Sequence, residues 1–428
     1  MDQTALPPRY SFRTGKASLR DMVLRGLPDP ASVIPDAILH EPAVQLPGYG
    51  APLVVACPDL ARQVLNDRAD HFTRDRLIRR AFRRTWGKGL AGAEGEDWHA
   101  QRRAAAPFFR PQAVLRHLSA FAKASDAVPL PEGKAFDLAE TVPRIIARIV
   151  TTTMLDLPRE TEAESIAPLV ADYVDKIAGF SAIDVLPLPE GLIDRYHGID
   201  QAGPVRAVRT LARRLASDWR ASKPHDDMMA LLDGVGPLED NLRGLFPAAL
   251  DTTVSGTSWA LYLLATRPDW QARVAAEAQA CAQDLSLDKL PITRRVVAEA
   301  LRLYPPAPML LRAAAQTFDL GGYTVRRGQS VVVAIYAAHR HRTHWPDPDR
   351  FDPDRFLAEN GHHAAYLPFG TGPRMCIAAQ FALAEIAVVV ARISARYRIE
   401  PAGDMPQVAL QATTRSANGI CVKASPRK

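Results

Sequence analysis

The sequence has few cysteines, and they lie far apart. Its 428 residues include four, Cys57, Cys281, Cys376 and Cys421, with no C-x-x-C spacing. Structural zinc sites and disulfide frameworks both need cysteines that are paired or closely spaced. The sequence therefore argues against both. Sparse, scattered cysteines are typical of a reducing compartment, so we expect a cytoplasmic protein.

The sequence also lacks a long apolar run. The segment Met1–Leu27 is polar and contains prolines, so it has the features of neither a secretory signal nor an anchor helix. Crossing a membrane takes about 20 apolar residues in a row, and no stretch approaches that length. We expect no membrane association. The Arg and Lys residues of this segment leave an organellar presequence as the alternative.

Neither sign of charge dominates, and aromatic residues are sparse. The formal net charge is +6, and 7% of the residues are aromatic. Proteins that bind single-stranded nucleic acid combine basic and aromatic side chains, and no stretch here interleaves them, so we expect no nucleic-acid partner. A small basic surplus suits a patch for an acidic protein. With 47% hydrophobic residues, the chain can bury a large core.

One cysteine stands in a distinctive loop. Residues 369–376 read F-G-T-G-P-R-M-C, and an apolar helical run, 377–393, follows Cys376 at once. The start of a helix presents free N–H groups and a positive dipole end, which favour a thiolate. The glycines free the loop's dihedrals, Phe369 can cover the sulfur, and Arg374 offers a cation to an acidic group. The alternative is a buried free cysteine after an ordinary turn.

The pattern F-G-x-G-x-R-x-C resembles the haem-binding loop of the cytochrome P450 family. This resemblance implies that the cofactor is haem b (iron protoporphyrin IX) and that Cys376 is the axial ligand of its iron. It also makes Phe369 and Arg374 cofactor-binding residues. Ala378 departs from the family pattern, which usually has a glycine there, close under the porphyrin. One added methyl group predicts a small adjustment.

A buried helix is predicted at 236–266, with an acid and a hydroxyl in its middle. Burying Asp251 and Thr252 costs free energy unless they are paired, so their presence needs a reason. A threonine can satisfy itself by bonding a carbonyl one turn back, which is the structural alternative. The stretch resembles the P450 motif [AG]-G-x-[DE]-T, which implies that Asp251 and Thr252 are catalytic and deliver protons. Ala249, where the family has glycine, and the helix breaker Pro247 are departures.

Three further residues complete the predicted cofactor site. Trp98 and Arg102 are four apart and share a helix face, which by itself indicates only a cation over an indole. Arg312 follows the apolar stretch 309–311 at the start of a predicted strand. The resemblance implies that Trp98, Arg102 and Arg312, together with Arg374, hold the haem propionates.

A Glu–Arg pair is predicted to support the fold near the cofactor. Glu299 and Arg302 lie three apart on a helix predicted at 290–304, which alone indicates a weak surface ion pair. The resemblance implies a structural motif completed by the arginine of a P-x-R-F segment. Two segments offer one, with Arg350 and Arg355, and the position after Trp345 favours Arg355.

The motifs follow one another in the order found in the P450 family. The resemblance covers residues from about 44 to 422 and implies a mainly α fold with a minor β region, the cytochrome P450 fold. We expect an N-terminal segment, 1–40, and a single domain, 41–428, with no fused reductase.

Local patterns predict several elements around these motifs. They are strands at 43–46 and 52–56, a helix at 58–66, a solvated Arg-rich stretch at 74–88 that ends in a flexible loop, a hairpin made by 323–325 and 330–335, and a last hairpin that ends at 420–423 with its turn near Thr413. Two helical regions joined by the Pro-rich connection 183–191 resemble the lid over the family's substrate pocket.

The resemblance implies a monooxygenase that inserts one oxygen atom from O2 into a small, mainly apolar organic substrate. Electrons from NAD(P)H would arrive through a separate ferredoxin-type or flavodoxin-type donor. A peroxide-driven peroxygenase and a non-catalytic haem-thiolate sensor are alternatives, and neither needs the pair Asp251 and Thr252. A cysteine hydrolase is remote, because no histidine stands in a partner motif.

The residues expected at the substrate and at the electron donor complete the sequence-based picture. Pocket candidates are mainly apolar and permit fatty acids, terpenoids, steroids or aromatics: Phe82, Phe246, Leu250, Met309, Leu310 and Thr413. Two basic clusters are expected to attract an acidic donor: Arg79, Arg80, Arg83, Arg84, Arg102, Arg103 and Arg110 in one, and Arg392, Arg396 and Arg398 in the other.

Overall fold

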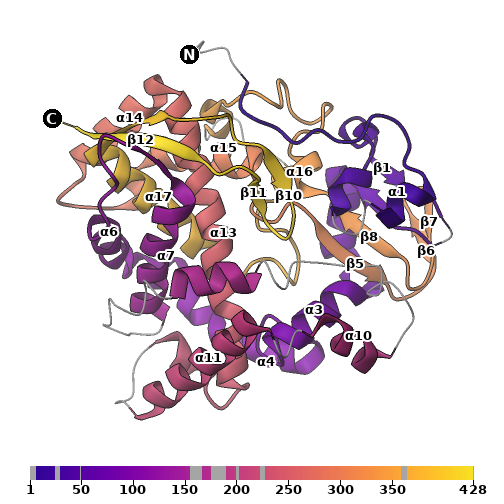
Figure 1. Ribbon diagram of the computed structural model, residues 1–428. Coiled ribbons are helices and arrows are strands. Elements are labelled where there is room, and N and C mark those ends of the chain that lie inside the picture. Colours follow the sequence, from indigo (N-terminus) through magenta and orange to yellow (C-terminus); the bar gives the residue numbers. More distant parts are fainter. Residues whose placement is uncertain are drawn as a thin grey trace.

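The computed structural model describes residues 6–24, 29–48, 50–154, 166–174, 189–198, 202–221, 227–357 and 364–427. Helices make up most of it, and most of the short strands gather on one side of the molecule (Figure 1). The predicted fold class, mainly α with a minor β region, is therefore confirmed.

The helices are spread along the whole described chain. Their bounds are α1 Leu19–Leu24, α2 Pro58–Arg62, α3 Arg76–Trp86, α4 Gly95–Ala105, α5 Pro111–Leu115, α6 Leu118–Asp126, α7 Leu138–Met154, α10 Glu190–His197, α11 Gly203–Ala221, α12 Met228–Leu232, α13 Leu238–Thr266, α14 Pro268–Ala280, α15 Pro291–Leu303, α16 Ile335–Ala338 and α17 Ala379–Arg396. Residues 166–174 are helical as well.

Helix α13, with 29 residues, is the axis of the fold. It runs through the middle of the molecule, and α7, α11, α15 and α17 pack against it (Figure 1). Every residue from 255 to 265 is buried, because this part of the helix is mainly apolar and other helices pack around it. Gly256 permits the close packing: a Cβ there would lie 3.0 Å from side-chain atoms of both Ile386 and Leu301. The helix predicted at 236–266 is confirmed, and it continues through Pro247.

Four small sheets complete the fold of the described residues. The strands are β1 Ala43–Gln45, β2 Leu53–Val55, β3 Phe72–Arg74, β4 Ala135–Asp137, β5 Leu310–Ala314, β6 Phe318–Leu320, β7 Tyr323–Val325, β8 Ser330–Val333, β9 Tyr397–Pro401, β10 Val408–Leu410, β11 Thr414–Ser416 and β12 Cys421–Pro426. The largest sheet has the order β1-β2-β8-β5-β3, with β2 and β8 parallel. The others are β4-β12-β9, β6-β7 and β10-β11.

Two predicted hairpins are wrong. Strand β7 pairs with β6, whereas β8 lies between β2 and β5. The valines of β8 are all buried, and a strand apolar on both faces belongs inside a sheet. Strand β12 pairs with β4 and β9 instead of joining the β10–β11 hairpin. Gly419, with φ of 83°, turns the chain away, and a Cβ there would lie 2.4 Å from Asp137 Oδ2.

The Arg-rich stretch near the N-terminus is also corrected. It forms α3, in which Arg79 and Arg83 are exposed, as expected for most of its arginines, but Arg80 is buried. The loop predicted as flexible is bonded to the start of α13: the Lys88 N–H donates to Asp240 and the Leu90 N–H to Asn241, over 2.8 and 2.7 Å. Most of the connection at 183–191 lies outside the described residues.

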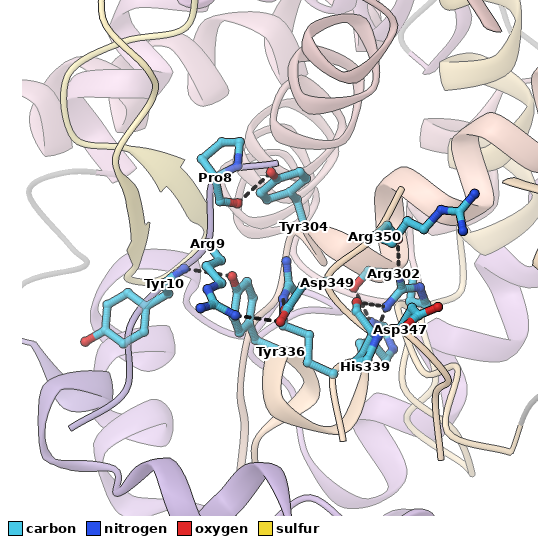
Figure 2. A network of polar contacts seen from close by, with 12 residues as sticks. Pro8, Arg9, Tyr10, Arg302, Tyr304, Tyr336, His339, Asp347, Asp349 and Arg350 are labelled. Carbon is cyan, nitrogen blue, oxygen red and sulfur yellow. Dashed lines mark hydrogen bonds and ion pairs between the residues drawn. The ribbon is translucent and has the colours of Figure 1, made fainter. Parts of the chain in front are cut away.

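The segment Pro8–Tyr10 crosses the region that follows α15. The Tyr304 hydroxyl donates to the Pro8 carbonyl over 2.7 Å, and Arg9 forms an ion pair with Asp349 at 2.6 Å (Figure 2). The Tyr10 N–H donates to the Tyr336 hydroxyl over 2.9 Å. Residues more than 290 positions away in the sequence thus anchor the first described residues.

Candidate active site

The loop that carries Cys376 is shaped by two glycines. Gly370 and Gly372 have φ of 68° and 78°, the left-handed region that favours glycine. The Cys376 N–H donates to the Phe369 carbonyl over 3.0 Å, which closes the loop on itself. A Cβ at Gly372 would lie 2.0 Å from the Leu65 carbonyl oxygen, so the loop rests directly on the π-helical turn Gln63–Asp67.

The Cys376 side chain is accessible, although protein surrounds it. Burial raises the pKa of its thiol, while the N–H of Ala378 and the guanidinium of Arg102 lower that pKa. An accessible sulfur approached by an N–H group and a cation is a suitable metal ligand in its thiolate form.

Four arginines from different segments converge beside this loop. Arg74 on β3 is directly opposite Arg312 on β5, and Arg374 in the loop acts electrostatically on both. The Arg102 guanidinium donates to the Met375 carbonyl over 2.8 Å. The indole ring of Trp98 contacts two of the cations: its centroid is 4.3 Å from the guanidinium carbon of Arg374 and 5.4 Å from that of Arg102.

The four cations are poorly compensated by the protein itself. Burial, and then the charge of Arg374, lower the pKa of Arg74 and Arg312 to about 10. Glu94 is 3.8 Å from Arg74 and offsets part of the repulsion. Like charges held this close favour binding of an anion, and guanidinium groups pair well with carboxylates. The cluster fits the two propionates of a haem.

Sequence reasoning named three of these arginines and missed Arg74. The stretch 74–88 looked like a solvated basic surface, but Arg74 is the last residue of a strand whose partner carries Arg312. Strand pairing between segments more than 230 residues apart decides this neighbourhood, and no local pattern shows it.

The acid and the hydroxyl of α13 have different partners. The Thr252 hydroxyl donates to the Ala248 carbonyl over 2.7 Å, which is the structural alternative that the sequence left open. Asp251 forms an ion pair with Arg415 of β11, with 2.7 Å between Oδ1 and Nη2. Adjacent helix positions point about 100° apart, so the two side chains face different neighbours.

The Glu–Arg pair of α15 is fully buried. Arg302 donates to both carboxylate oxygens of Glu299 over 2.6 and 2.8 Å. Its other N–H groups reach the carbonyls of His339, Pro348 and Arg350 (Figure 2). Arg355 approaches Glu299 to 3.5 Å, which confirms the choice of Arg355 over Arg350.

His339 links this network to the cysteine loop, a role that the sequence did not indicate. Its Nδ1 lies 3.0 Å from the Arg302 carbonyl, and its Nε2 accepts the Leu367 N–H over 2.8 Å. Burial, and then the charge of Arg302, lower the pKa of His339 to about 3, so the ring is neutral and Nδ1 carries the proton. Leu367 lies two residues before Phe369, so the buried network positions the start of the loop.

Comparison with known proteins identifies the family. Residues 236–423 match the family model for cytochrome P450. The chain is 31% identical over 376 residues to the cyclooctat-9-en-7-ol 5-monooxygenase of Streptomyces melanosporofaciens, a match that covers 81% of this chain and 80% of that protein. The chain belongs to the cytochrome P450 family. This P450 is also 27% identical over 423 residues to the cyclooctatin synthase of the same organism, with 92% and 90% of the two chains covered.

A solved structure gives the same fold. The crystal structure of the cytochrome P450DA haem domain matches this P450 with a TM-score of 0.74 and 23% identity, over 90% of each chain. The predicted fold, haem b as the cofactor, and the assignment as a P450 monooxygenase are therefore confirmed. The roles of individual residues stay predictions. Within the described ranges, no helix of this P450 is both long and apolar enough to cross a membrane.

The close approach at Gly372 leads to a testable prediction. Gly372→Ala should displace the cysteine loop, because its Cβ would collide with backbone atoms of residues 65 and 66. We expect poor haem retention and loss of the absorption band that the reduced carbon monoxide complex shows with thiolate ligation. Gly328→Ala is the matched control, since Gly328 has a similar φ of 81° and open space around it. It should cost only about 1–2 kcal/mol of backbone strain. The same haem content in both variants would contradict the prediction.

Proposed function

We propose that this P450 inserts one oxygen atom from O2 into a small, mainly apolar organic substrate, with electrons from NAD(P)H delivered by a separate protein. The observation that carries this proposal is the accessible Cys376 thiol beside a cluster of half-buried arginines. Cys376 would be the protein ligand of the haem iron, and the bound haem would supply the redox chemistry that activates O2.

The remaining site residues orient the cofactor and move protons. Trp98, Arg102, Arg312 and Arg374 hold the propionates, and we add Arg74 to this set because it repels Arg312 and Arg374 in the same way. Phe369 packs against the main core, and we propose that its ring covers the sulfur. Asp251 takes up protons from solvent, and the Thr252 hydroxyl passes them on when it leaves the Ala248 carbonyl.

An acid next to a hydroxyl in the sequence of the central helix favours a monooxygenase over the two alternatives. A peroxide-driven enzyme receives its oxygen already protonated, and a sensor transfers no protons, so neither has a use for Asp251 in an otherwise buried helix face. Product formation with H2O2 in the absence of a reductase, at the rate of the complete system, would favour the peroxygenase.

The substrate class is proposed from the lining residues and the relatives. Phe246, Leu250 and Thr413 are buried, and Met309 and Leu310 are partly buried. One relative is named for action on cyclooctat-9-en-7-ol, an unsaturated alcohol. We therefore favour an apolar unsaturated alcohol among the candidate substrates. Titration with such alcohols and with fatty acids, followed by the shift of the haem absorption band, ranks the two classes directly.

The electron donor is proposed to be an acidic ferredoxin-type or flavodoxin-type protein. Arg79, Arg83, Arg103 and Arg110 are exposed. The second basic cluster contributes less than the sequence indicated, because its members pair with acids. Arg392 and Arg396 both contact Asp126, at 2.5 and 2.9 Å. Arg398 contacts Glu400 at 2.9 Å.

We also propose that residues 41–428 act as a single catalytic domain in the cytoplasm. All four cysteines of the chain are free, which suits a reducing compartment.

Charge reversal tests the docking surface. Arg103→Glu or Arg110→Glu should slow reduction by an acidic ferredoxin at low salt, because exposed charges act mainly on the association rate. The difference from wild type should shrink at physiological salt, where charges are screened beyond about 8–10 Å. Haem content and substrate affinity should stay unchanged. Stopped-flow reduction at several ionic strengths measures the effect, and a rate indifferent to both salt and charge would place docking elsewhere.

Replacement of the proposed ligand tests the function as a whole. The wild-type protein, reduced under carbon monoxide, should show the red-shifted absorption band of a thiolate complex, and Cys376→His should abolish it. Cys281→Ser is the matched control, because Cys281 is a buried cysteine that packs with Ala278, Leu290 and Ala391. This variant should leave the band intact. Persistence of the band in Cys376→His would mean that another residue is the ligand.

A further inference from the structure

One face of α13 is covered by β11 through polar contacts. Asp251, Ser255 and Trp259 are spaced four residues apart, so they lie one above another on the same face. Each of them bonds to Thr414 or Arg415. Three successive turns of the central helix are therefore attached to two neighbouring residues of the C-terminal hairpin.

Thr414 anchors this contact. It is fully buried, and its carbonyl accepts from the Ser255 hydroxyl over 2.7 Å and from the Trp259 indole over 3.3 Å. On the other side, its N–H donates to the Pro306 carbonyl over 3.0 Å and its hydroxyl to the Pro305 carbonyl over 2.5 Å. Four hydrogen bonds to two different segments leave the backbone before Arg415 little freedom to move.

The stacking below Thr414 adds to this rigidity. Trp259 stacks on Tyr304, with ring centroids 3.9 Å apart and planes 9° from parallel. The Tyr304 hydroxyl is held in turn by the Pro8 carbonyl. The hairpin thus rests on α13 and on the residues that follow α15. Through Trp259 and Tyr304 it is also connected to the N-terminal segment, where Tyr304 bonds to Pro8 (Figure 2).

Arg415 extends from this anchored backbone to the acid of α13. Its Nη2 lies 2.7 Å from Asp251 Oδ1, and its Nε donates to the Thr413 hydroxyl over 2.9 Å. The guanidinium is planar, so bonds on two of its edges fix both its position and its orientation. The two side chains of the ion pair are only 27% and 16% exposed, so the pair is mostly shielded from solvent.

We propose that Arg415 is a positioning residue for proton delivery: it holds Asp251 by Oδ1 and leaves Oδ2 to exchange protons. This proposal rests on the proposed function. A proton arrives from solvent at Oδ2 and passes to the Thr252 hydroxyl, while that hydroxyl releases its own proton towards the reacting oxygen. The carboxylate returns to its starting state, and no electrons move in this step. Arg415 itself touches neither substrate nor cofactor in this scheme.

A carboxylate on a helix face needs such a partner for two reasons. Shielding a charge from water costs several kcal/mol unless an opposite charge is close by, and Arg415 supplies that charge. An unheld aspartate also samples several rotamers, and a proton relay needs the oxygen at a defined place. Arg415 meets both needs with one contact.

A double-mutant cycle tests the proposal. We expect Arg415→Gln to slow product formation by about 10-fold, less than the loss of 100-fold or more typical when a general acid–base group is removed. More of the consumed NAD(P)H should appear as peroxide, and the solvent isotope effect on turnover should increase. In an Asp251→Asn background, Arg415→Gln should have no further effect on product formation, because Arg415 acts only through Asp251.

Two controls separate positioning from a general loss of structure. Arg415→Lys keeps the positive charge beside Asp251, so it should recover part of the rate lost in Arg415→Gln. A purely structural role of the Arg415 side chain would not predict this recovery. Arg267→Gln removes another partly buried arginine, ion-paired to Asp269 at the far end of α13, and should leave the peroxide yield at the wild-type value. Haem content, substrate affinity and the carbon monoxide band should be unchanged in every variant.

The outcomes separate failure of the proposed role of Arg415 from failure of the proposed function. The role of Arg415 would be overturned if Arg415→Gln formed as much product per NAD(P)H as the wild type. It would also be overturned if the losses of product formation in Arg415→Gln and Asp251→Asn multiplied in the double variant. Either result would leave the proposed monooxygenase activity standing. Wild-type turnover in Asp251→Asn would remove the relay from the proposed function and the role of Arg415 with it. Loss of the thiolate band in the wild-type protein would instead contradict the proposed function itself.

Discussion

The buried ion pair between Glu299 and Arg302 is the contact on which the cofactor side of this P450 depends. Both side chains are fully buried, so removal of either leaves an uncompensated charge, which costs about 3–5 kcal/mol. Because Arg302 also binds the carbonyls of Pro348 and Arg350, it orders a segment without regular structure. Through His339 the same network reaches Leu367, where the cysteine loop begins.

The substrate side depends on α13 in a comparable way. Much of the helix is apolar, and two of its polar residues, Asp251 and Ser255, bond to β11. Two sets of contacts therefore position the site. The buried Glu299–Arg302 network holds the start of the cysteine loop, and the hydrogen-bonded β10–β11 hairpin holds Asp251 of the central helix. Both are built from contacts between distant segments, and both include α15 or the residues that follow it.

Motifs allowed most of the site to be predicted. Cys376, Trp98, Arg102, Arg312 and Arg374 were named from short patterns, and the structure brings them together beside one loop. Arg74, His339 and Arg415 were missed because their roles come from partners in other elements. Arg74 depends on strand pairing, His339 on burial behind Arg302, and Arg415 on the hairpin anchored by Thr414.

The sequence by itself determined the family, the fold class, the cofactor, the long central helix and the glycine-shaped loop, because each follows from short motifs, from their order along the chain, or from local periodicity. Periodicity identifies a buried helix, and a short motif with fixed spacing identifies a loop. Only the tertiary structure decided which strand pairs with which, and therefore where β8 and β12 lie. It also decided the partners of the charged groups. A buried charge is stable only beside a compensating group, and for Asp251 that group lies 164 residues further along the chain.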